Sequence, residues 1–179
     1  MTMTERLGIN PYGRLTEPAT LVIERLLPGP VSRIWQYLTD GDMRRKWLAA
    51  GAMEEKAGAA FELIWRNDEL TNPPGDRPDG FGEEMRMKSR VVELQMHKRL
   101  VFTWGESGEV AFDLRPEGDE VLLTVTHRRI SDRANMLMVG AGWHMHLDIL
   151  AAKLSGAQPE PFWDGWVRLK DEYDRRLPA

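Results

Sequence analysis

The spacing of hydrophobic residues changes several times along this chain, and each change predicts a new element. Residues 20–27 are β-branched and partly alternating, which indicates a first strand, and the Pro-Gly-Pro run at 28–30 ends it. Apolar residues then recur at helical spacing over 31–38. A second short helix is expected over residues 42–49, where Trp47 is the one large anchor.

A period of two follows and predicts a run of half-buried strands that are antiparallel neighbours. The expected strands cover residues 61–66, 85–91, 100–104, 110–114 and 121–128. Residues 71–80 (TNPPGDRPDG) interrupt them with a loop that has no pattern able to pack, and this loop is a candidate mobile flap.

The helical period returns after Ser131-Asp132, a typical helix start, and Gly156 ends the longest expected helix. Gly140 and Gly142 weaken its first half, so we expect a bend or break near them. A last short helix presents an apolar side made of Phe162, Trp166, Leu169 and Tyr173. About six antiparallel strands with one apolar face need a cover, and the long helix is the element that can supply it. The pattern predicts an α+β fold, a sheet wrapped on a helix.

Composition narrows the choice of compartment and partner. The chain has 179 residues, a net charge of -4 and no cysteine, which argues against disulfides, a thiolate nucleophile and nucleic-acid binding. No apolar run approaches the ~20 residues that span a bilayer, and no leader-like segment is seen at the start, so we expect a cytoplasmic protein with no membrane partner. Residues 1–19 lack a sustained period and are expected to form an N-terminal arm, on the surface or disordered, before a single domain over 20–177.

Four stretches in this order are similar to the AHSA1-like branch of the START/Bet v 1-like superfamily. They are WQYLTD at 35–40 with Trp47, VEL at 92–94 running to RLVFTW at 99–104, residues 121–127, and Gly142-Trp143 with the leucines up to Gly156. The resemblance covers about residues 20–177. It implies a helix-grip fold, in which a strongly curved antiparallel sheet grips the C-terminal helix, with a cavity between them in many members.

The chain also departs from this family pattern. Met96-His97 stands where relatives tend to carry prolines, and the loop at 71–80 is longer than the common pattern. The ligand class of relatives is therefore not carried over. Hsp90 is not expected as a partner, because the resemblance implies that the activator function also relies on a further domain.

Inward-facing aromatic and methionine positions make a ligand cavity the leading functional hypothesis, with plain core packing as the alternative. The bound molecule would be small and hydrophobic or amphipathic, and no cofactor is required. The candidate lining residues are Trp65, Met85, Met87, Phe102, Trp104, Phe112, His127, Trp143 and Leu147. Met138 and Met145 would add flexible walls, whereas Arg86, Lys88 and Arg90 are typical of a solvated strand face.

His127 has two interpretations. It shares the inward parity of Val121, Leu123 and Val125, so it is either a core histidine satisfied by a neighbour or a polar contact inside the cavity. His144 and Asp148 are i, i+4 neighbours, an arrangement that more often means a surface hydrogen bond or salt bridge than an acid–base pair. No metal-binding pattern occurs, and His144 and His146 point to different sides of the helix.

Two other functions remain open. An enzyme of cyclase, hydratase or hydrolase type would use the same cavity, with His127 or Glu62 transferring protons, although Glu62 has the outward parity. A protein-interaction role, including co-chaperone action, would use an exposed apolar patch around Trp163 and Trp166. A homodimer formed through an edge strand or the C-terminal helices is a further possibility.

Overall fold

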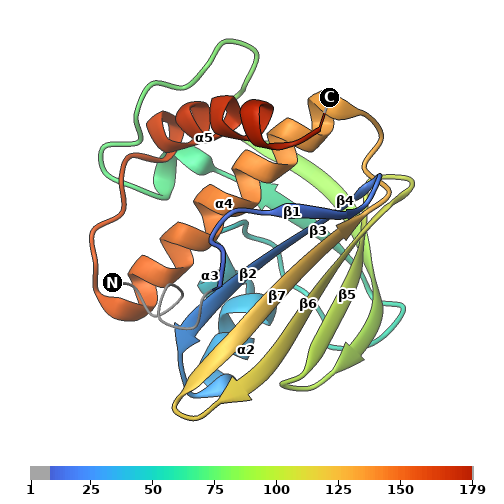
Figure 1. Ribbon diagram of the computed structural model, residues 1–179. Helices are drawn as coiled ribbons and strands as arrows, with labels where there is room; N and C mark the ends of the chain where they lie inside the picture. The colour runs from blue at the N-terminus through green and yellow to red at the C-terminus, as the bar shows by residue number, and fades with distance from the viewer. Residues whose placement is uncertain (1–8, 179) are drawn as a thin grey trace.

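A computed structural model describes residues 9–178, and its central feature is one curved antiparallel sheet (Figure 1). Within that part of the chain, seven strands pair in the order β1-β2-β7-β6-β5-β4-β3. The strands are β1 (Arg14–Glu17), β2 (Thr20–Pro28), β3 (Ala60–Trp65), β4 (Met85–Gln95), β5 (Arg99–Trp104), β6 (Gly108–Glu117) and β7 (Glu120–Arg128). The pairing of β2 with β7 brings the first long strand beside the last one, so the α+β fold predicted from the pattern is confirmed.

Helices connect or cover the strands. The connection from β2 to β3 holds α2 (Val31–Thr39) and α3 (Gly41–Arg44), and a 3₁₀ turn, η1 (Asn67–Glu69), follows β3. The two C-terminal helices are α4 (Arg133–Ser155) and α5 (Phe162–Arg176). Asp132 caps α4 by accepting from the backbone N–H of Asn135, and Gly156 ends it in a left-handed conformation. Both ends of the long helix are therefore as predicted.

Helix α4 is continuous through Gly140 and Gly142, so the chain does not break there. Gly140 instead allows α5 to approach closely, because a Cβ there would lie 3.3 Å from the ring of Tyr173. Gly165 on α5 has the same role, since a Cβ there would lie 2.5 Å from the sulfur of Met145. The two helices pack at glycine positions, and tertiary contact outweighs the low helix propensity of glycine.

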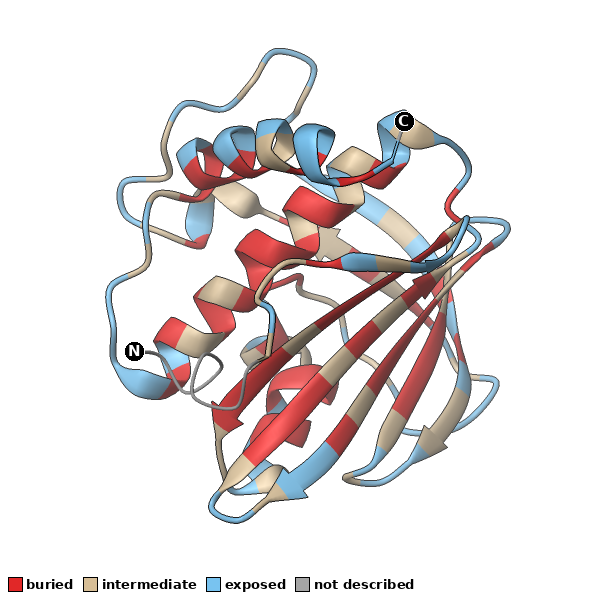
Figure 2. Ribbon diagram, viewed as in Figure 1, coloured by how far each residue is buried: buried red, intermediate tan, exposed pale blue. Residues whose placement is uncertain are grey.

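The middle of α4 is buried on every side. Trp143, His144, Met145, His146 and Leu147 are consecutive in the sequence and all buried, which no single helix face permits. The sheet covers one side of the helix, while α5 and the segment before β1 cover others (Figures 1 and 2). The sequence pattern predicted a single apolar stripe on this helix. The cover by α5 and the segment before β1 explains why His144 and His146 are buried as well.

One local prediction was wrong and another gains detail. Of the expected N-terminal arm, residues 1–8 lie outside the described residues, and Arg14–Glu17 pairs with β2 as an edge strand. This strand is too short to show a period, so pairing with β2 decides its conformation. The second short helix was predicted over residues 42–49, which is wrong: it ends at Arg44, whose buried side chain bonds the carbonyls of Leu38, Thr39 and Ala49 and so holds the following turns.

None of the helices between residues 9 and 178 has the length and apolar character needed to cross a membrane.

Candidate functional site

A cavity of about 400 Å³ lies between one end of the sheet and the two C-terminal helices. Strands β3, β4 and β5 provide one wall, the first half of α4 a second, and the start of α5 a third. The loop that joins η1 to β4 adds Phe81. The lining residues are Leu48, Trp65, Asn67, Phe81, Met85, Arg86, Met87, Trp104, Asn135, Met138, Val139, Gly142, Trp143, His146, Phe162, Trp163 and Trp166.

Aromatic rings make two clusters on opposite walls of the cavity. On the sheet side, the ring centroid of Trp104 lies 5.4 Å from that of Trp65 and 5.6 Å from that of Trp143. On the α5 side, Phe81 lies 5.1 Å from Trp163 and 5.2 Å from Trp166. These distances are typical of favourable tilted or edge-to-face pairs, so each wall is preformed.

Flexible side chains stand at the rim. Met85 and Met138 line the cavity and are exposed. Arg86, also exposed, is held by Glu84 at 2.7 Å and Glu62 at 2.9 Å, which neutralise it. The rim therefore combines adaptable thioethers with a paired cation, while the interior is largely apolar.

The loop expected to be a flap is tied to the start of α5. The backbone N–H of Trp163 donates to the carbonyl of Pro74 at 2.9 Å, and that of Phe162 donates to Oγ1 of Thr71 at 2.9 Å. The backbone N–H of Asp76 donates to the Asp164 carboxylate at 3.2 Å. These bonds seat the loop on α5 and bring Phe81 against the cavity, although the loop itself has no packing pattern.

The cavity gathers part of the set of residues predicted from the sequence. Trp65, Met85, Met87, Trp104 and Trp143 line it, together with Met138. Phe102, Phe112 and Leu147 belong to the buried core cluster and lie outside the lining, as do Met145 and the buried His127.

The cavity also lies nearer the start of α4 than expected. Its α4 residues run from Asn135 to His146, whereas the lining residues predicted on this helix were Trp143 and Leu147. In the second half of the helix, Leu147, Ile149 and Leu150 have no exposed surface.

His127 is satisfied by a neighbour in the core. The indole N–H of Trp143 donates to Nδ1 of His127 at 3.0 Å, and the ring of Trp104 packs on it at 4.9 Å. Burial lowers the pKa of His127 to about 4, so the ring is neutral at physiological pH. His127 therefore supports two lining residues, Trp104 and Trp143, from within the core.

Sequence reasoning missed the polar and α5 parts of the lining. His146 lines the cavity, and Nδ1 of its ring lies 2.8 Å from the carbonyl oxygen of Trp47. Trp163 and Trp166 were expected to form an exposed patch, but both are buried against Phe81. A lone phenylalanine between two glycines in the loop was the available signal for this contact.

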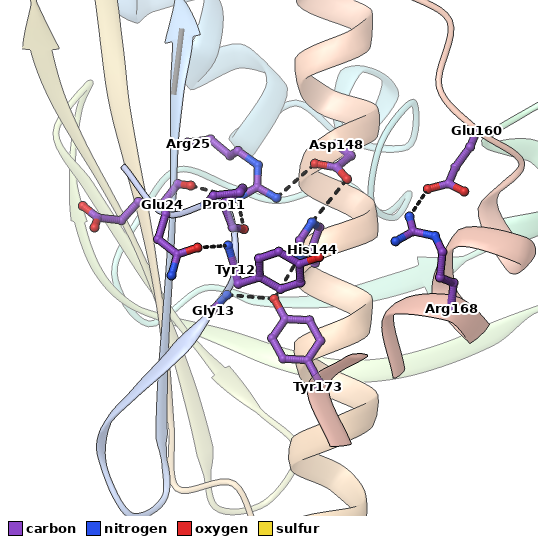
Figure 3. A network of polar contacts seen from close by, with 11 residues as sticks. Pro11, Tyr12, Gly13, Glu24, Arg25, His144, Asp148, Glu160, Arg168 and Tyr173 are labelled. Atoms are coloured by element: carbon purple, nitrogen blue, oxygen red, sulfur yellow. Dashed lines mark hydrogen bonds and ion pairs between the residues drawn. The ribbon is translucent and has the colours of Figure 1, made fainter. Parts of the chain in front are cut away.

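His144 faces away from the cavity, into a polar network that joins the N-terminal segment to both C-terminal helices (Figure 3). The hydroxyl of Tyr173 accepts from the backbone N–H of Gly13 at 2.7 Å and lies 2.9 Å from Nδ1 of His144. Asp148 lies 3.5 Å from the other ring nitrogen and 3.0 Å from Arg25. His144 and Asp148 were expected at the surface, but Tyr173 and the segment before β1 bury the histidine.

The other candidate groups for catalysis lie outside the cavity. Glu62 is half-buried, pairs with Arg86 and does not line the cavity. Across residues 9–178, no cluster of histidine and carboxylate side chains could hold a metal ion. The arrangement supports enclosure of an apolar molecule better than it supports a proton-transfer pair.

A curved antiparallel sheet closed on a C-terminal helix, with a cavity at one end, defines the helix-grip, Bet v 1-like class. Residues 28–155 match the family described as activator of Hsp90 ATPase homolog 1-like protein, and the chain belongs to that family. No functionally curated protein matches the chain.

Solved structures share the same fold. The protein encoded by gene BPP1335 of Bordetella parapertussis is 36% identical over 94% of this chain and 91% of its own, with a TM-score of 0.77. CalU16 of Micromonospora echinospora is 22% identical over 91% of this chain and 93% of its own, with a TM-score of 0.64. A conserved protein of unknown function from Enterococcus faecalis, EF2215, is 20% identical over 92% and 88%, with a TM-score of 0.67.

The polar network makes a stability prediction. Tyr173→Phe removes the hydroxyl that serves Gly13 and His144 and leaves buried polar groups unpaired, which should lower the free energy of unfolding by about 1–3 kcal/mol. Urea unfolding measures this change. Tyr12→Phe is the matched control, because the Tyr12 hydroxyl makes no hydrogen bond within the described residues, and it should change stability by less than about 0.5 kcal/mol. Equal effects of the two variants would contradict the role of the network.

Three buried histidines make stability depend on pH. Burial lowers the pKa from 6.5 to about 4 for His127, about 3 for His144 and about 4 for His146. Between the folded and unfolded pKa values, the unfolded chain binds more protons than the folded chain. The contribution of the three histidines to the free energy of unfolding is therefore complete above pH 6.5 and is lost as the pH falls toward 4. Burial raises the pKa of Asp148, and this shift has the opposite effect on stability as the pH falls. It involves one titrating group, whereas the histidines are three. Urea midpoints should fall from pH 7.5 to pH 5, and a flat or rising midpoint would refute the assignment.

Proposed function

We propose that this protein binds a small hydrophobic or amphipathic molecule in the cavity between the sheet and the C-terminal helices. The observation that carries the proposal is the cavity of about 400 Å³ with tryptophans on opposing walls. A space of this size within a packed domain leaves much apolar surface without protein contacts, which a bound molecule would cover. The largely apolar lining and flexible methionines favour ligands of varied shape.

Membership of the family supports this proposal at the level of the fold. The helix-grip architecture leaves a hollow between sheet and helix, and in this chain the hollow is lined rather than filled by its side chains. The enzyme alternative lacks a titratable candidate among those predicted from sequence, since neither His127 nor Glu62 lines the cavity. The interaction alternative loses its exposed tryptophan patch.

Gly142 offers a direct test, because it lines the cavity and a Cβ added there would meet no atom within 4 Å beyond its own stretch of helix. Gly142→Leu should fill part of the cavity and weaken binding of the neutral dye N-phenyl-1-naphthylamine at least about tenfold, measured by dye fluorescence. Gly142→Ala, the small control, should bind the dye nearly as well. Both variants should fold, and the alanine should raise stability by about 0.5–1 kcal/mol because glycine is a poor helix former.

The proposal fails if the wild-type protein does not bind the dye, or if Gly142→Leu binds it as tightly as the wild type does. Native mass spectrometry of freshly purified protein provides an independent reading, because a retained small molecule would appear as added mass.

A further inference from the structure

One side chain inside the cavity has a hydrogen-bonding atom that the protein does not use. His146 is 6% exposed and lines the cavity. The carbonyl oxygen of Trp47 lies 2.8 Å from its Nδ1, and a carbonyl only accepts, so Nδ1 carries the proton. In the neutral ring this makes Nε2 an acceptor, and residues 9–178 supply no hydrogen bond to it.

The surroundings of His146 keep its ring neutral and oriented. The ring of Phe162 lies 4.9 Å from it, and burial lowers its pKa to about 4. The bond to Trp47 fixes which nitrogen is protonated, so a lone pair rather than an N–H remains available on Nε2. The acceptor therefore exists before any ligand enters, and binding need not reorganise it.

A second neutral polar group lines the same cavity. The side-chain oxygen of Asn67 is buried and has no hydrogen-bond partner among the described residues. Unpartnered buried acceptors are rare in folded proteins and cost stability, so they often mark a site completed by another molecule. Because the Asn67 oxygen is itself buried, His146 provides the acceptor that a guest in the cavity would meet, which indicates a guest that donates.

The charges of the lining argue against an ionic guest. No aspartate or glutamate occurs among the lining residues, so an ammonium group would lose its hydration without a counter-charge. A carboxylate would meet the lone pair of His146, and Arg86, the cation of the lining, is already paired with Glu62 and Glu84. An uncharged donor, such as an alcohol or a phenol, meets neither penalty.

We infer that the cavity takes an uncharged amphipathic molecule whose hydroxyl group donates a hydrogen bond to Nε2 of His146, while its apolar part lies among the tryptophans. This inference rests on the proposed function. His146 is then a specificity-determining residue that distinguishes hydroxylated guests from plain hydrocarbons, ethers and acids.

Three naphthalene derivatives test this inference by calorimetry: 2-naphthol, 2-methoxynaphthalene and 2-naphthoate. The naphthol should bind about five- to tenfold more tightly than the ether, and the carboxylate should bind most weakly. The extra methyl of the ether adds apolar area, so burial alone would favour the ether. A preference for the naphthol therefore reports the hydrogen bond.

His146→Phe keeps an aromatic ring but removes the acceptor, so the ratio of naphthol to ether affinity should fall to about one, with ether affinity little changed. His97→Phe is the control, because it makes the same change at a histidine outside the cavity lining, and it should keep the ratio. Asn67→Ala tests the other acceptor. A ratio that persists in His146→Phe and is lost in Asn67→Ala would overturn the assignment to His146.

A nitrogen NMR spectrum keeps the inference falsifiable if His146→Phe does not fold. The Nε2 resonance of His146 in the wild-type protein should move toward its protonated position on addition of 2-naphthol, and not on addition of 2-methoxynaphthalene. Equal wild-type affinity for naphthol and ether overturns this inference and leaves the proposed function standing. Failure of all three compounds to bind overturns both.

Discussion

Burial of the middle of helix α4 on all sides is the constraint from which the rest of this structure follows. Five consecutive buried residues, Trp143 to Leu147, cannot all face one sheet, so the helix needs other elements as cover. The curved sheet, helix α5 and the segment before β1 share this task (Figure 2). The cavity lies where that cover is incomplete, beside the first half of the helix. Enclosure of α4 and the presence of a hollow are therefore consequences of one packing arrangement.

The two histidines on α4 have different surroundings in this arrangement: one is bonded within the protein, and the other adjoins the cavity. His144 faces the N-terminal segment, where Tyr173 satisfies Nδ1 and Asp148 lies near the other nitrogen. His146, two residues later, points to another side, where Trp47 satisfies one nitrogen and the cavity adjoins the ring. Their pKa values are lowered by the same cause, burial, yet only His146 keeps an acceptor for a guest.

Much of the fold could be predicted from periodicity. Strands with one buried face show alternating apolar and polar residues, and capping residues mark where a helix begins and ends. The parity of His127 placed its side chain correctly on the buried side, but parity does not reveal which neighbour meets it. The indole of Trp143 does, and the histidine becomes a support beneath the lining. Strand β1 was too short to carry a pattern, and its pairing partner decides its conformation.

The candidate site was predicted only in part, for a physical reason. Its sheet wall comes from regular strands, so Trp65 and Trp104 could be found by alternation. Its opposite wall depends on Phe81 from an irregular loop meeting Trp163 and Trp166 on α5, a contact between distant segments that no local pattern records. Without Phe81 those tryptophans resemble an exposed patch. His146 and Trp47 are likewise far apart in the sequence, and the Trp47 carbonyl fixes the tautomer of His146.

The most direct measurement of the central claim is NMR of the protein carrying ¹³C-labelled methionine methyl groups, titrated with N-phenyl-1-naphthylamine. The account predicts large shifts for the lining residues Met85, Met87 and Met138, and little change for the packed Met145 or the distant Met96. Shifts confined to methionines outside the lining, or no shifts at saturating dye, would contradict a ligand site in this cavity.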